Sequence, residues 1–432
     1  MEKMKKIVMS ESFGGVFLFC CAVLAMIVAN SGLSEWYFHL WHEQVGLSIA
    51  GKFYGFDLHL WVNDVLMSLF FLMVGLEIKR EFLFGGLSGF KKAAFPAIAA
   101  IGGMIVPAGI YLAFNMGTET SHGFGIPMAT DIAFALGVVL MLGKRVPPAL
   151  KLFLVTLAVV DDLGAIVVIA IFYSSGIAWE WLGVSAFLTG VLFAFNYGGV
   201  RNLIPYLCVG VALWFCIHES GIHATISAVI LAFTIPAKPK IFTQDFLRDV
   251  QKDLLDFNKA EEERKDILLT NGHFDAVHQI TKRLSYVQNP LLKLEHSLHS
   301  LSTYLIMPLF AFANAGVSLS GGVDFASMHL MLGVILGLLI GKPLGILLLT
   351  FLCEKLGIAT RPTGIAWSHI LGAGILAGIG FTMSIFVANL AFTQASFVEI
   401  AKISILSASL LAGILGSLFL LVLGRKSNVV EF

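Results

Sequence analysis

The 432-residue sequence is poor in charged residues and in cysteine, and both shortages restrict what the protein can be. Only 13% of its residues are charged, against roughly 25% in an average soluble domain. The five cysteines lie inside or at the ends of apolar segments and form no Cys-x-x-Cys pair. We therefore expect neither a disulfide framework nor a zinc site. The formal net charge is zero, and we expect no nucleic-acid partner.

Long apolar runs dominate the chain instead, and 57% of its residues are hydrophobic. A helix needs about 20 residues to cross a bilayer, and runs of that length recur throughout residues 1–432. The sequence predicts an all-α polytopic membrane protein in which the chain forms a single transmembrane domain. About twelve spans are expected, centred near Phe19, Phe71, Gly103, Phe134, Val160, Phe187, Gly210, Val229, Leu309, Leu336, Ile375 and Leu415.

Lysine and arginine are distributed unequally between the two sides that these spans define. Of the 28 basic residues, 25 lie in segments on one side, Lys52 and Lys402 lie on the other, and Lys342 lies within a span. Because basic residues collect on the cytoplasmic side of membrane proteins, we expect both termini to be cytoplasmic.

Two stretches outside the apolar runs have patterns of their own. Residues 44–60 alternate apolar and polar side chains and predict a β-hairpin on the outer face, with a plain loop as the alternative. Residues 238–293 form a charged cytoplasmic insertion, with helices expected over about Asp245–Leu269 and Phe274–Val287. We interpret this insertion as a solvated helical hairpin without chemistry.

Two adjacent carboxylates, Asp161 and Asp162, lie in the middle of the apolar run from Ala149 to Tyr173. A charge at bilayer depth costs roughly 2.5 kcal/mol or more, so a pair of them indicates a function. Neighbours on a helix diverge by about 100°, so one carboxylate can hold a cation while the other meets a counter-ion. Carboxylate oxygens suit a hard cation such as Na⁺ or Li⁺ and also accept protons. The alternative is two buried salt bridges with no transported species.

Glycine and proline interrupt two other spans, and ionisable residues lie close to these interruptions. Asp131 ends the string Pro127-Met-Ala-Thr-Asp131, Lys342 lies in the tenth span, and the eleventh contains Gly378-Ile-Gly380. Spans three to five and ten to twelve therefore form two triplets with an interrupted middle member. This pattern predicts inverted repeats whose two broken helices cross at the membrane midplane. Asp131 and Lys342 have the charges that would balance the half-helix ends there.

Several strings, in order along nearly the whole chain, resemble those of NhaA-type sodium/proton antiporters, a standard example of inverted-repeat transporters. The matching strings are Phe70-Phe-Leu-Met-Val-Gly-Leu-Glu-Ile-Lys-Arg-Glu81, Pro127-Met-Ala-Thr-Asp131, Ala158-Val-Val-Asp-Asp162, Leu294-Glu-His-Ser-Leu-His299, Pro308-Leu-Phe-Ala-Phe-Ala-Asn-Ala-Gly316, Gly341-Lys-Pro-Leu-Gly345 and Gly378-Ile-Gly-Phe-Thr-Met-Ser384.

The resemblance implies a bacterial inner-membrane transporter that exports Na⁺ or Li⁺ in exchange for H⁺, is regulated by pH and forms a homodimer partly through the outer hairpin. It implies no enzyme activity and no cofactor beyond the transported ions. Asp161 and Asp162 would form the ion site, with Asp162 binding the cation. Thr130 and Asp131 would lie at the helix crossing, and Lys342 would pair with Asp161 and balance the helix ends. A pH-responsive cytoplasmic cluster would contain Glu77, Arg80, Glu81, Glu295, His296 and His299.

The chain departs from the family pattern at two places beside that cluster. It carries the insertion at 238–293, and Ser300-Leu301 stands where the family pattern has Pro-Trp. The spacing alone places Glu295, His296 and His299 on one helix face, which is also typical of an ordinary polar helix start. These departures concern regulation, whereas the strings around Asp161 and Asp162 are intact.

Two functions from other classes remain to be weighed. An intramembrane aspartyl protease would resemble Tyr-Asp and Gly-x-Gly-Asp strings, and neither occurs in a span here. A sodium-coupled symporter of an organic solute is the main alternative, and it would need a roomier midplane site with aromatic or amide contacts. Two carboxylates and a lysine supply more proton-binding groups than one monovalent cation replaces, so we expect electrogenic exchange.

Overall fold

The computed structural model describes residues 11–49, 52–174, 176–239, 243–261, 271–318 and 328–427, and almost all of them are helical. The helices are α2 (Glu11–Ala29), α3 (Ser34–His42), α4 (Leu58–Leu60), η1 (Trp61–Leu66), α5 (Met67–Phe84), α6 (Phe90–Asn115), η2 (Glu119–Met128), α7 (Ile132–Leu142), η3 (Gly143–Arg145), α8 (Pro148–Phe172), α9 (Trp179–Tyr197), α10 (Leu203–Glu219), α11 (Thr225–Thr234), α12 (Thr243–Glu261), α13 (Asn271–Val287), α14 (Pro290–Leu301), η4 (Ser302–Ile306), α15 (Met307–Asn314), α16 (Met328–Leu336), η6 (Gly337–Gly341), α17 (Lys342–Lys355), α18 (Trp367–Ala377), α19 (Phe381–Ala391) and α20 (Ala395–Ser427).

Many of these helices are long and apolar enough to cross a membrane. Six continuous helical segments of the described chain satisfy that test, and two further pairs bent at a short break raise the number to eight. The shorter helices α10 and α11 are also apolar. The prediction of an all-α polytopic membrane protein is confirmed, while the count of about twelve spans stays a prediction.

The two triplets of helices each have a break in their middle member. In the first, extended backbone at residues 129–131 separates η2 from α7, between α6 and α8. In the second, the chain bends by 49° between α18 and α19, between α17 and α20. The backbone N–H of Asp131 donates to the carbonyl of Ile379 at 2.7 Å. The two breaks therefore meet.

Glycines allow the helices of the two triplets to approach closely. A Cβ atom built on Gly102 of α6 would lie 2.2 Å from the carbonyl oxygen of Gly345 on α17, and one on Gly345 would lie 2.0 Å from that of Gly102. Neither position has room for a side chain, so the two backbones pack directly against each other. This contact holds α17, which begins at Lys342, beside the first triplet.

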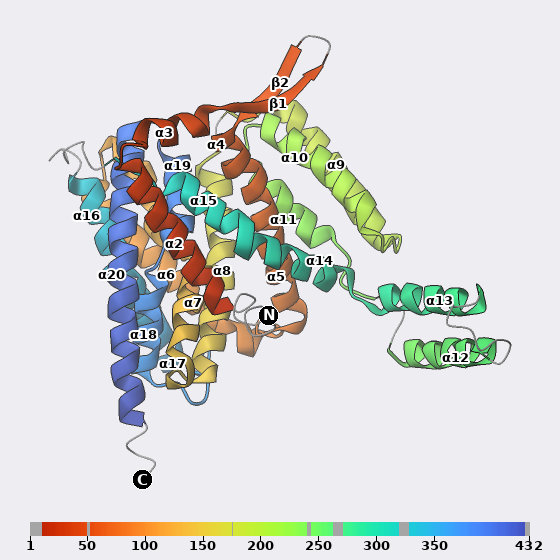
Figure 1. The fold of residues 1–432 in the computed structure, drawn as a ribbon. Helices are drawn as coiled ribbons and strands as arrows, with labels where there is room; N and C mark the ends of the chain where they lie inside the picture. The colour runs from red at the N-terminus through yellow and green to blue at the C-terminus, as the bar shows by residue number, and fades with distance from the viewer. Residues whose placement is uncertain are drawn as a thin grey trace.

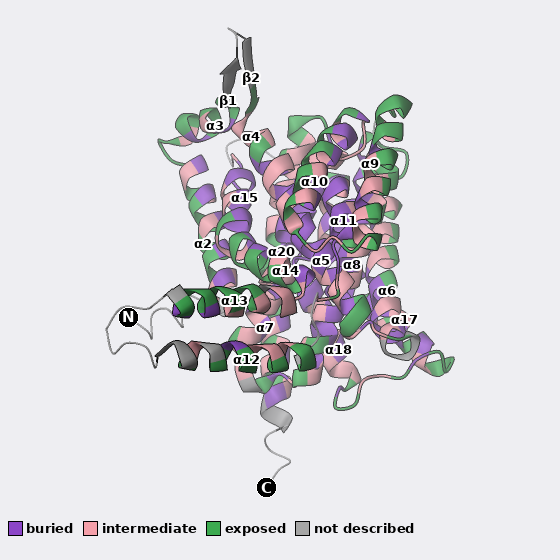
Figure 2. Ribbon diagram, turned by 90° about the vertical axis from the view of Figure 1, so that its right-hand side faces the viewer, coloured by how far each residue is buried: buried purple, intermediate pink, exposed green. Residues whose placement is uncertain are grey.

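Non-membrane elements lie toward opposite ends of the bundle (Figure 1). Strands β1 (Gln44–Ile49) and β2 (Lys52–Asp57) pair antiparallel and project from the end that carries α3, within the range where a hairpin is expected. Helices α12 and α13 lie across the direction of the spans, in the other half of the molecule. Figure 2, viewed from the side, shows the exposed surfaces of these two helices in front of the more buried bundle.

The two helices within the insertion are held together by ion pairs. Arg283 on α13 contacts Asp249 and Asp253 on α12, each at 2.5 Å. The second expected helix, Phe274–Val287, lies within α13, and the first is described as far as Glu261. The expected end of the first helix, near Leu269, lies outside the described residues. The same holds for the turn of the β-hairpin at residues 50–51 and for both chain termini.

Candidate ion-binding site

Asp131 lies between the first turns of two half-helices. Its carboxylate caps α7 by accepting from the backbone N–H of Phe134 at 2.9 Å. Its other oxygen accepts from the backbone N–H of Thr382 at 3.1 Å and from the Thr382 hydroxyl at 2.5 Å, at the start of α19. Helix N-termini carry partial positive charge, so one fully buried carboxylate neutralises both. In Figure 1, α19 lies toward the hairpin end and α7 toward the opposite end.

Thr130 and Lys342 lie at the other side of the same crossing, where α18 ends. The Thr130 hydroxyl is 3.0 Å from the carbonyl oxygen of Ala377, the last residue of α18. The ammonium group of Lys342 donates to that hydroxyl oxygen at 2.7 Å. A positive charge near a helix C-terminus is favourable because the last carbonyls carry partial negative charge. Thr130 thus connects the lysine to the end of α18.

Lys342 also forms a buried ion pair with Asp161 on α8. The distance from its Nζ to Asp161 Oδ2 is 2.5 Å, and the two side chains are 1% and 3% exposed. A five-residue π-helical turn, η6, directly precedes Lys342, and such turns are frequent at functional positions. Removing either partner of such a pair would leave an uncompensated buried charge.

Two carboxylate groups at this point have oxygen atoms without hydrogen-bond donors. Asp161 Oδ1 is buried and has no partner among the described residues. Asp162 is 4% exposed and accepts no hydrogen bond from any side chain in the described part of the chain. A buried oxygen normally has a donor, so Asp161 Oδ1 is available to a cation or a proton. Hard monovalent cations prefer such oxygen ligands.

The cluster expected to respond to pH lies where α5 meets α14. Arg80 contacts three carboxylates: Glu81 at 2.8 Å, Glu295 at 2.8 Å and Glu77 at 3.6 Å. The structure therefore brings four of the six predicted residues together. The Glu81 side chain also accepts from the backbone N–H of Gly86 at 2.7 Å, which ties α5 to the turn that follows it.

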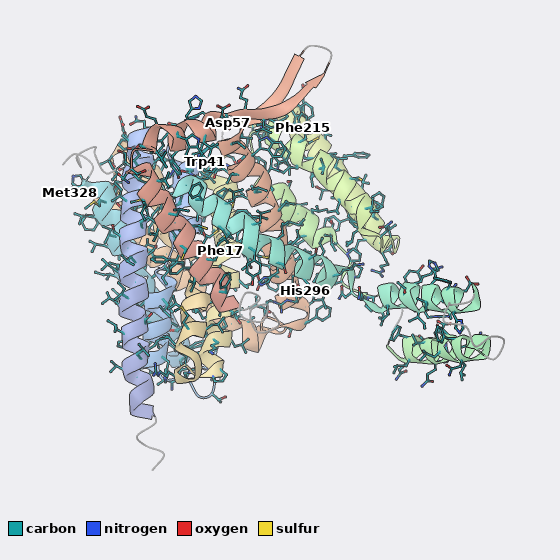
Figure 3. All side chains as sticks on the ribbon, in the orientation of Figure 1. Phe17, Trp41, Asp57, Phe215, His296 and Met328 are labelled. Carbon is teal, nitrogen blue, oxygen red and sulfur yellow. The ribbon has the colours of Figure 1, made fainter. Side chains whose placement is uncertain are left out.

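The two histidines of the predicted cluster make no ion pair with Arg80 or its three carboxylates in the described part of the chain. His296 and His299 are exposed on α14, and neither forms an ion pair with a residue that the structure describes. Figure 3 labels His296, in the middle of α14, on the side of the bundle from which the chain leads to the helices of the insertion. Glu295 and the two histidines lie on the same helix, α14, and of these three residues it is Glu295 that contacts Arg80.

Comparisons with known proteins agree with this arrangement. Residues 5–420 match the family described as Na⁺/H⁺ antiporter 1. The chain is a member of this antiporter family. It is 61% identical to Na⁺/H⁺ antiporter NhaA 2 of Helicobacter hepaticus, over 98% of this chain and 95% of that protein. It is 59% identical to NhaA of Wolinella succinogenes (98% and 93% covered) and 57% identical to NhaA of Helicobacter pylori strain G27 (98% and 96% covered).

The structure of this antiporter-family member adds residues that the sequence analysis did not assign. Thr382 contacts Asp131 with both its hydroxyl and its backbone N–H, and the Ser384 hydroxyl donates to the carbonyl of Ile126 on η2 at 2.8 Å. Both residues lie in the Gly378–Ser384 string that marks the break. The available signal was the pair of hydroxyl residues two and four positions after Gly380 in an apolar span, because freed backbone groups in a membrane need polar partners.

Proposed function

We propose that this chain exchanges Na⁺ or Li⁺ for protons, with Asp161 and Asp162 as the shared binding groups. The observation that carries the proposal is the arrangement of Asp161, whose Oδ2 is held by Lys342 and the Thr130 hydroxyl while its buried Oδ1 has no hydrogen-bond partner among the described residues. The next residue along α8 is Asp162, which is also buried. Such a site offers several oxygens to one small cation. The same oxygens can be occupied by protons, so the two species compete, and family membership supports the same function.

Binding of a cation at this site would also affect the protonation of Lys342. A cation bound at Asp162 places a second positive charge near the neighbouring Asp161 carboxylate, which Lys342 already contacts at 2.5 Å. Two positive charges that share one carboxylate group as a neighbour repel more strongly in a low-dielectric environment than in water. Lysine can respond by releasing a proton, since its ammonium group is readily deprotonated when buried. Cation binding would thus displace protons from both Asp162 and Lys342.

Release of two protons per cation makes the exchange electrogenic. Moving more protons inward than sodium ions outward carries net positive charge into the cell. An inside-negative potential contributes about 2.3 kcal/mol per charge per 100 mV, so it drives sodium export. We also propose that the protein lies in a bacterial inner membrane, where the potential is inside-negative. Both termini would be cytoplasmic, as the distribution of lysine and arginine predicts.

The direct test uses purified protein in vesicles that contain no organic solute. A preformed pH gradient should collapse on addition of Na⁺ or Li⁺. A sodium-coupled symporter would leave the gradient unchanged until its solute is added, so this assay separates the two functions. Failure of both cations to collapse the gradient, with the protein shown to be folded and inserted, would contradict the proposal.

Regulation by pH is proposed for the cluster around Arg80, because it joins α5 to α14 through charged groups that lie next to the insertion. We also propose a homodimer joined partly by strands β1 and β2. A two-stranded sheet leaves strand edges that can pair with another chain, and Val45 and Phe56 are exposed on it.

Deleting residues 243–288 and bridging the gap with a short flexible linker should preserve exchange, because no intramembrane ionisable group is removed. The pH at which exchange begins should shift, since the deletion removes charged residues from the segment that leads directly into α14, the helix of Glu295, His296 and His299. The shift should be smaller at 1 M salt, where the Debye length falls to about 3 Å. The measurement is vesicle exchange against pH at low and high salt. Complete loss of exchange in a well-folded deletion would show that the insertion belongs to the transport machinery.

A further inference from the structure

A second buried polar cluster, separate from the ion site, lies toward the β-hairpin end of the molecule. The side-chain amide of Asn63 donates to the His59 ring at 2.9 Å. Asn314 donates to Asn63 Oδ1 at 2.8 Å, and Asn389 donates to Asn314 Oδ1, also at 2.8 Å. These bonds form one continuous chain of four side chains, which we call the asparagine chain.

The asparagine chain connects helices that belong to different parts of the fold. His59 lies on α4, two residues after the hairpin, and Asn63 lies on η1. Asn314 is the last residue of α15. Asn389 lies on α19, the half-helix whose first turn contacts Asp131. The bond from Asn389 to Asn314 therefore crosses from a broken-helix triplet to helices that lie outside both triplets.

Two members of the asparagine chain are buried, so their hydrogen bonds contribute to the stability of the fold. Asn314 has no exposed surface and Asn63 is 8% exposed. Asn314 uses its amide group fully, because it also donates to the carbonyl of Phe310 at 3.2 Å. Buried amides without partners are costly, so each member of the chain stabilises the position of the next. A π-helical turn at Trp61–Leu66 carries Asn63, and such turns often accompany functional positions.

The boundary that the asparagine chain crosses is apolar closer to the ion site. Phe386, about one turn before Asn389 on α19, packs against Phe71 of α5 with ring centroids 5.4 Å apart and against Phe310 of α15 at 6.4 Å. These ring contacts supply apolar packing, whereas a hydrogen bond between two amides also requires a particular donor–acceptor distance and angle. The amide pair therefore defines the position of α19 against α15 at this end.

We propose that Asn389 and Asn314 are positioning residues that hold α19 against α15 and keep the hairpin side of the ion site closed. The inference rests on the proposed exchange. In inverted-repeat transporters one bundle moves against the other around a fixed site, so a bond that crosses the boundary must break when the site opens to that end. Asn63 supports Asn314, and His59 supports Asn63.

Asn389→Ala should shift the conformational equilibrium toward opening at the hairpin end. Net loss of one hydrogen bond corresponds to about a 2- to 13-fold change in an equilibrium constant. The apparent KM for Na⁺ presented at the hairpin end should fall by such a factor, and the KM at the opposite end should rise. A purely structural role would lower thermal stability without opposite changes at the two sides. Asn258→Ala on the exposed surface of α12 is the matched control.

A labelling experiment tests the same inference without requiring transport. Ala388→Cys introduces a thiol at a buried position next to Asn389, in a background whose five native cysteines are replaced by serine. A membrane-impermeant maleimide applied at the hairpin end should react faster when Asn389→Ala is added, and equally slowly with Asn258→Ala. Asn389→Leu, which keeps the volume, should behave like the alanine variant.

Unchanged labelling at the hairpin end in both Asn389 variants would overturn the proposal, as would equal changes of KM at both sides. Failure of the proposed exchange is distinguishable from this result, because it would appear as absent sodium-driven proton flux in the unsubstituted protein. The labelling rates would still report whether Asn389 keeps α19 closed.

Discussion

Asp162→Asn is expected to reduce sodium-driven proton flux to the background of protein-free vesicles. The substitution keeps the shape of the side chain but removes a titratable oxygen ligand, so cation and proton no longer compete at this position. Asp161→Asn should have the same effect, since it also removes the partner of Lys342. The measurement is proton flux on addition of Na⁺ to vesicles containing each variant.

Asp275→Asn is the matched control for these two variants, because Asp275 is an exposed carboxylate on α13. It should exchange at the unsubstituted rate. Size-exclusion chromatography and thermal unfolding would establish that the Asp161 and Asp162 variants insert and fold. Robust sodium-driven flux from both well-folded variants would show that the ion site lies elsewhere.

Lys342→Ala should lower both thermal stability and exchange. The change leaves the buried Asp161 carboxylate without its counter-ion and the end of α18 without a nearby positive charge. Removing one partner of a buried ion pair typically costs about 3–5 kcal/mol, so a clear fall in the unfolding temperature is expected. The measurement is thermal unfolding of purified protein alongside exchange in vesicles.

Lys342→Arg separates the two roles of the lysine. Arginine keeps the positive charge but does not readily release a proton. Stability should therefore be close to that of the unsubstituted protein, while exchange is reduced or altered. Lys252→Ala, on the exposed surface of α12, is the charge-removal control. A Lys342→Ala variant that matches the unsubstituted protein in both stability and transport would exclude Lys342 from the site.

The class of fold followed from the sequence because long apolar segments have few structural solutions in a membrane. Charges within such segments are costly, which is why Asp131, Asp161 and Lys342 could be selected before any geometry was known. Glycine-rich strings marked both helix breaks for a related reason, since backbone groups freed at membrane depth need polar partners. The structure then joins Lys342 and Asp161 directly, and places Asp131 at the same helix crossing through its backbone bond to Ile379.

The contacts between distant segments could not be derived from the sequence in the same way. Asn314 and Asn389 are uncharged, and single asparagines in apolar spans have many possible partners. Their pairing depends on how α15 and α19 pack. The direction of Glu295 toward Arg80 likewise depends on the contact between α14 and α5, which the spacing of Glu295, His296 and His299 does not specify.

The central claim is that one cation displaces more than one proton from Asp161, Asp162 and Lys342. Its most direct test is sodium-driven proton flux in vesicles with the membrane potential clamped by valinomycin and potassium. The flux should accelerate when the potential favours proton entry and slow when the potential is reversed. Identical rates and extents at zero and opposing potentials would mean electroneutral exchange, and would contradict the role given to Lys342.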